Sequence, residues 1–124
     1  MLAFTDPREA YRRSEFDARV EGGADPSDLV RLCYEQAIGG LGLAVIAHER
    51  KDPAARSKAL TRALSAVTAL DMGVDRSAPL AGPLLQLYAA AKRAILDSVV
   101  SFDSTLLGQV RQDFVEIARA LEDA

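Results

Sequence analysis

The sequence predicts an all-α fold: an antiparallel four-helix bundle with a short N-terminal helix or arm. Apolar residues recur every three or four positions along four long segments, and strand-like alternation with hairpin turns is absent from the sequence. An aspartate precedes three of these segments, twice within an Asp-Pro pair. Such a side chain caps the free N–H groups at a helix N-terminus, and proline fits the first helical position.

The four helices are expected to follow one another with mostly short links, which make consecutive helices antiparallel. The first is expected to begin at Asp25, the second at Asp52 and the last after Asp103. The third begins less clearly, because Pro79 and Pro83 compete as its start. The expected bounds are 26–51, 53–72, 80–101 and 104–122.

The chain of 124 residues is expected to form one domain with a single core. A weaker helical pattern at 7–16 is followed by a Gly-Gly link. Residues 1–24 are therefore expected to form an arm with a short helix, and residues 25–124 the bundle.

Composition and charge exclude several classes of function. The net charge of −3 offers no basic face for nucleic acid. The apolar stretch without charge at 36–47 is shorter than the roughly 20 residues of a membrane-spanning helix. The N-terminus does not resemble a signal peptide, and the single Cys33 cannot form an internal disulfide. These features fit a cytoplasmic protein without membrane insertion.

Three glycines, Gly39, Gly40 and Gly42, stand in the apolar stretch "AIGGLGLAVIA" of the first helix. A phosphate-binding loop would need a preceding strand and a GK[ST] sequence, and both are missing. The apolar residues of this helix cover well over half its circumference, more than a bundle core requires. Gly39 and Gly40 lie at the edge of this surface. They allow close approach either of a partner's backbone or of a neighbouring helix, and the sequence leaves both readings open.

The sequence offers no catalytic or metal-binding constellation, so neither enzyme activity nor a cofactor is expected. The only histidine, His48, lies 15 positions from Cys33 on the same helix, about 22 Å away, too far for a nucleophile–base pair. Val45 stands where a di-iron bundle would place the glutamate of a Glu-x-x-His motif. A histidine-phosphotransfer bundle using His48, with Lys51 three residues later, remains an alternative. Asp52 follows at once, where that family has glycine.

An ordered set of motifs, from Tyr11 through "DPSDLVRLCYEQAIGGL" and "LAGPLLQLY" to Asp103, resembles the flagellin export chaperones of the FliS type over residues 11–121. The motif "SPxxLVxMLYDGAIxxL" of that family has "DPSDLVRLCYEQAIGGL" as its counterpart, and "IAxNLxxLY" has "LAGPLLQLY". Tyr11, the "LD" at Leu70 and the conspicuous Asp103 also keep their order. The family's Asp-Gly before "AI" is Glu-Gln here, its Asn is Pro83, and its C-terminal Trp is replaced near Leu121. The resemblance therefore indicates a divergent member.

The resemblance implies a cytoplasmic chaperone that binds the disordered C-terminal segment of flagellin and prevents premature polymerisation. It also implies delivery to the flagellar secretion apparatus, with the export gate and other flagellar proteins as further partners. The client would wrap around the bundle and place short helices in apolar grooves. The residues expected to contact the client are Tyr11, Leu29, Leu32, Gly39, Gly40, Leu43 and Met72.

Self-association is the chief alternative to this function. The excess apolar surface of the first helix also fits a homo-oligomerising helical adaptor without a disordered client. A chaperone of this kind could likewise form a homodimer when client-free. The arm around Tyr11 is the other expected cover for the apolar surface.

Overall fold

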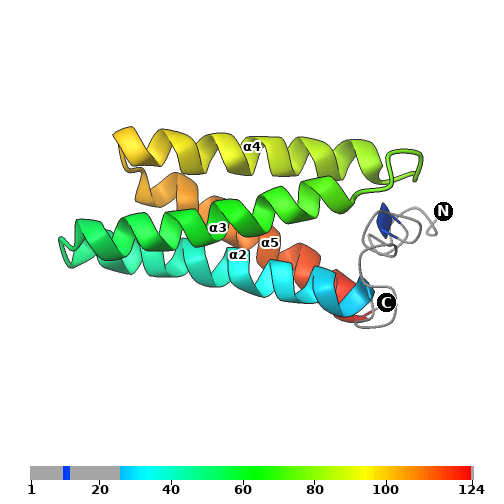
Figure 1. Cartoon of the computed structure of the whole chain (residues 1–124), viewed down its shortest axis with the longest axis horizontal. Helices are drawn as coiled ribbons and strands as arrows, with labels where there is room; N and C mark the ends of the chain where they lie inside the picture. The colour runs from blue at the N-terminus through cyan, green and yellow to red at the C-terminus, as the bar shows by residue number, and fades with distance from the viewer. Residues whose placement is uncertain (1–9, 12–25, 124) are drawn as a thin grey trace.

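The structure is a computed structural model that describes residues 10–11 and 26–123. Within this part of the chain it contains four α-helices and no strand. Figure 1 shows α3 between α2 and α4, with α5 passing behind them. The helices are α2 (Pro26–Glu49), α3 (Pro53–Gly73), α4 (Ala81–Val100) and α5 (Ser104–Asp123). The all-α four-helix fold is confirmed, and the helices end within two residues of the expected bounds. The short helix expected at 7–16 lies outside the described residues except for Ala10 and Tyr11, which form part of a 3₁₀ turn.

Two of the three expected aspartate caps are present. Asp52 Oδ1 accepts a hydrogen bond from the backbone N–H of Ala55 at 3.1 Å, at the start of α3. Asp103 Oδ1 accepts from the N–H of Leu106 at 3.0 Å, at the start of α5. The third, Asp25, lies outside the described residues. Each cap satisfies a backbone donor that the helix itself leaves free.

The turn between α2 and α3 is unusually tight for a sequence without glycine at this point. Lys51 adopts a left-handed conformation with φ of 58°. The N–H of Lys51 donates to the carbonyl of His48, and the N–H of Asp52 donates to that of Ala47. This pair of bonds is a Schellman motif, which ends α2 and reverses the chain within three residues.

The core contains all three tyrosines of the chain, and two of them pack against Phe114. Their hydroxyls form one chain: Tyr11 bonds to Tyr88, and Tyr88 bonds to Tyr34. The Tyr11 hydroxyl also donates to the carbonyl oxygen of Leu70 at 3.2 Å. Because each hydroxyl has one proton, Tyr34 donates to Tyr88 and Tyr88 donates to Tyr11. Tyr34 and Tyr88 also contact the Phe114 ring, with centroids 5.5 and 5.9 Å away.

Gly40 brings α2 and α3 into close contact. A Cβ atom at this position would lie 2.9 Å from both the carbonyl oxygen of Ala59 and the backbone nitrogen of Ala63. Both distances are shorter than van der Waals contact allows, so only glycine fits without separating the helices. Of the two interpretations left open by the sequence, tight helix packing is sufficient to explain a glycine at position 40.

Helix α2 is the one apolar segment that meets the length and hydropathy of a membrane span within the described residues, over Ser27–Glu49. The core helix of a soluble protein meets the same criterion. In this bundle the inner side of α2 is buried against its neighbours, through residues that include Tyr34, Ala37 and Leu41.

Candidate functional site: an apolar groove on the α2–α3 face

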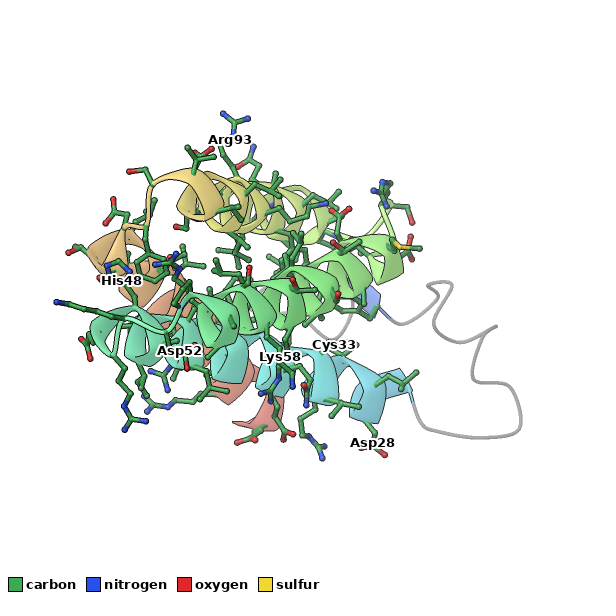
Figure 2. The ribbon with its side chains drawn as sticks, turned by 60° about the vertical axis from the view of Figure 1, so that its left-hand side comes forward. Asp28, Cys33, His48, Asp52, Lys58 and Arg93 are labelled. Carbon is green, nitrogen blue, oxygen red and sulfur yellow. The ribbon has the colours of Figure 1, made fainter. Side chains whose placement is uncertain are left out.

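A groove of about 470 Å³ lies between α2 and α3, at the end of the bundle where the two helices join. Figure 2 labels Asp52 and Lys58, two of its lining residues, at the N-cap and in the second turn of α3. Its lining comes from the last turns of α2 and the first turns of α3. The lining residues are Leu43, Ile46, Ala47, Arg50, Asp52, Ala55, Lys58, Ala59 and Arg62.

The groove leaves two large apolar side chains partly in water. Leu43 is 48% exposed and Ile46 is 44% exposed, and one helical turn separates them. Exposed apolar area carries a free-energy cost of about 25 cal/mol per Å². Ala55 and Ala59 on α3 are small, so they leave the space above Leu43 and Ile46 open. Such a concave apolar surface can accept the side chains of a partner helix.

The apolar side chains of this face continue beyond the groove along both helices. On α2, Leu32 is 48% exposed, and it lies in the same heptad row as Ile46. On α3, Met72 is 46% exposed, and it lies in the same heptad row as Lys58. The antiparallel pairing places the start of α2 beside the end of α3, so Leu32 and Met72 lie toward the same end of this helix pair.

Three of the residues expected to bind client are therefore exposed on α2 and α3: Leu32, Leu43 and Met72. Leu29 is partly buried and packs against the core. Gly39 lies beneath the Arg62 guanidinium, where a Cβ would be 3.1 Å from Nη2.

Gly40 and Tyr11 occupy different places from the others. Gly40 is buried in the α2–α3 interface. Tyr11 is 3% exposed, and its contact with Leu70 lies two turns beyond Arg62 along α3. Both positions have structural roles that need no client: Gly40 sets the helix spacing, and Tyr11 completes the core.

Sequence reasoning missed Ile46 and the cations of the groove. Ile46 follows Leu43 by three residues, so the helical period that selected Leu43 also predicts Ile46 on the same side. Lys58 and Arg62 are four residues apart and so share a face of α3. Their proximity to Leu43 depends on the register of the α2–α3 pair, which the sequence alone did not provide.

The comparisons with known proteins place the chain in a family. The model of the family described as "Flagellar protein FliS" matches residues 7–124. The chain belongs to the FliS family. A comparison with curated proteins finds no match. FliS proteins are flagellar export chaperones, and the resemblance in sequence motifs is thereby confirmed.

His48 has a packing role in this FliS protein. Its ring stacks on Phe102, with centroids 4.2 Å apart and an interplanar angle of 17°. Arg56 Nη1 lies 3.0 Å from His48 Nδ1, and the guanidinium carbon lies 5.7 Å from the Phe102 ring centroid. Because arginine is only a donor, Nδ1 accepts this hydrogen bond. These contacts join α2, α3 and the α4–α5 link, and they engage one nitrogen and one face of the His48 ring.

A second group of exposed apolar side chains lies where α4 meets α5. It consists of Leu96, Val99, Val100 and Leu106, of which Val100 is 91% exposed. This group contains none of the residues that the sequence selected for client binding. It therefore provides a comparison surface for tests of the groove.

Proposed function

We propose that the chain is a non-enzymatic cytoplasmic chaperone that binds the C-terminal segment of flagellin through the α2–α3 face. Binding would cover the segment, prevent premature filament assembly and keep flagellin competent for delivery to the export gate. The proposal combines the family with one observation of this chain. The groove contains half-exposed Leu43 and Ile46, and no described residue has a side chain large enough to cover them.

The physical basis of binding is transfer of apolar surface from water on both partners. Leu43 and Ile46 gain contacts when an apolar side chain of the client enters the groove. Covering such side chains contributes about 25 cal/mol per Å² of apolar area. A disordered client loses conformational entropy as it becomes a helix, which offsets part of this gain. The net affinity therefore depends on several apolar anchors along the face, of which Leu32 and Met72 are candidates.

Calorimetric titration with the C-terminal segment of flagellin from the same organism tests this proposal. We expect a 1:1 complex, a strongly negative heat-capacity change from apolar burial, and co-elution of the two partners in size exclusion. Absence of binding at micromolar concentration, with the helical content intact, would contradict the proposal. If the chain alone then forms concentration-dependent oligomers, this result supports the alternative hypothesis of a homo-oligomerising adaptor.

A further inference from the structure

We infer that the α2–α3 groove takes an amphipathic helical segment that carries carboxylates beside its apolar anchors. The inference rests on the proposed function and deepens it, because it names the chemistry of the client segment that enters this groove. It is argued from the charges that line the groove, from their lack of partners and from the shape of its floor.

The groove is cationic on an acidic protein. Arg50, Lys58 and Arg62 line it, against the single carboxylate of Asp52. The whole chain has a net charge of −3, so the local charge of the groove is opposite in sign to that of the chain. Asp52 is already engaged, because its Oδ1 caps α3 through the N–H of Ala55. The groove therefore attracts anionic groups and repels cationic ones.

Two of these cations have no partner within the part of the chain that the structure describes. Across residues 10–11 and 26–123, neither the Arg50 nor the Lys58 side chain forms a hydrogen bond or an ion pair. Arg62 Nε donates to Gln36 Oε1 at 2.6 Å, which leaves its terminal N–H groups available. All three side chains are exposed at the edge of the apolar floor. A carboxylate on an arriving segment can pair with them while its apolar neighbours are buried.

The shape of the floor fits a helix. Ala47, Ala55 and Ala59 keep the centre of the groove low, and a third helix can then approach to the usual interaxial distance of about 8–10 Å. Leu43 and Ile46 stand one turn apart and match apolar anchors spaced three or four residues apart on the partner. Acidic residues beside those anchors would lie next to Arg50 and Lys58, since these flank the floor at the α2–α3 turn and on α3.

Two synthetic helical peptides with identical apolar positions test the inference, one with glutamate and one with lysine at every flanking position. Fluorescence anisotropy at low salt measures their affinities for the full chain. We expect the glutamate peptide to bind at least about tenfold more tightly, with the preference shrinking as salt screens the charges. The double variant Arg50→Glu/Lys58→Glu should reverse the preference.

Arg93→Glu is the matched control. Arg93 is exposed and projects from the outer face of α4, away from α2 (Figure 2). This variant changes the net charge by the same amount per substitution but leaves the groove intact, so the preference for the glutamate peptide should persist. If the double variant loses helical content, Arg50→Gln/Lys58→Gln replaces it, and the preference should then disappear.

Equal affinity for the two peptides, binding of neither, or a preference that survives the double variant would overturn the inference. The flagellin segment is titrated in the same buffer to separate this failure from that of the proposed function. Binding of flagellin without any charge preference leaves the proposed function standing and removes the inference. Charge-dependent binding of the peptides without binding of flagellin supports the groove chemistry and removes flagellin as its client.

Discussion

The two sides of α2 differ in how completely their side chains are buried. On its inner side, Tyr34 is 1% exposed and hydrogen-bonded, and Gly40 brings α3 as close as the backbone permits. On its outer side, Leu43 and Ile46 remain nearly half exposed above alanines too small to cover them. The inner side supplies the free energy of folding, and this allows the outer side to keep apolar area in water. A helix of the bundle can thus serve stability and recognition on opposite sides.

Phe114→Ala should have the largest effect on stability, because it removes packing against the inner side of α2. Phe114 is fully buried against Tyr34 and Tyr88, so its removal leaves a cavity and should lower the free energy of unfolding by about 3–5 kcal/mol. Leu43→Ala, on the outer side of α2, should lower the free energy of unfolding by less than about 1 kcal/mol, because the Leu43 side chain is already half exposed. Urea denaturation measures both. Similar costs for the two variants would contradict the comparison.

High pH should also destabilise the inner side. Burial raises the pKa of Tyr11, Tyr34 and Tyr88 well above the ordinary value of about 10. Above that pH the unfolded chain loses phenolic protons that the folded chain keeps. The three tyrosines therefore lower the free energy of unfolding by about 4 kcal/mol for each further pH unit, whereas below pH 10 their contribution is constant.

Absorbance of phenolate at 295 nm, followed with circular dichroism, checks this dependence. Phenolate should appear together with loss of helix. Tyr34→Phe removes one titrating group and should reduce the pH slope by about a third. Phenolate formation in a chain whose helical signal is unchanged would contradict the assignment of the three tyrosines to the core.

Gly40→Ala should lower the free energy of unfolding, because Gly40 lies at the close contact between α2 and α3. The added Cβ meets backbone atoms of Ala59 and Ala63 at 2.9 Å, and overpacking of this kind costs about 1–3 kcal/mol. Gly108→Ala is the matched control, because nothing lies within 4 Å of its added Cβ. That variant should stabilise α5 by up to about 1 kcal/mol through helix propensity. Thermal melting distinguishes opposite signs, and stabilisation by Gly40→Ala would contradict the close α2–α3 contact.

Lys51→Gly should have the smallest effect. Lys51 holds a left-handed φ of 58° at the end of α2, a conformation that costs a side chain about 1 kcal/mol and glycine little. The variant should stabilise the fold by about 0.5–1 kcal/mol, after allowance for the greater entropy of glycine when unfolded. A rise of a few degrees in Tm is the expected readout. A fall in Tm would show that the Lys51 side chain makes a larger contribution than its exposure indicates.

The helices were predictable because their signals are local. Asp52 and Asp103 mark helix starts through bonds to N–H groups three residues away, and apolar periodicity marks the helix interiors. The resemblance to FliS chaperones was likewise contained in the order of the motifs. The sequence also selected Leu43 for the client site, because the apolar surface of its helix exceeds what a core needs.

The remaining features depend on contacts between distant residues. Gly40 was compatible with helix packing or client contact, and its close approach to Ala63 on α3 could not be predicted from the sequence. Tyr11 joins the core through Leu70 and Tyr88, 59 and 77 positions away. The cations of the groove, such as Lys58, approach Leu43 only through the register of the α2–α3 pair. Local patterns carry no information about that register.

The affinity of Leu43→Asp for the C-terminal flagellin segment tests the central claim most directly. A carboxylate at this position places charge on the apolar floor, and we expect binding to weaken by at least about tenfold. Leu106→Asp makes the same change at a similarly exposed position on α5, 41% exposed against 48%, and should alter the affinity by less than about threefold. Calorimetry of both variants, each checked for unchanged helical content, gives the answer. Undiminished binding by Leu43→Asp, or loss of binding by Leu106→Asp alone, would contradict the assignment of the α2–α3 face as the client site.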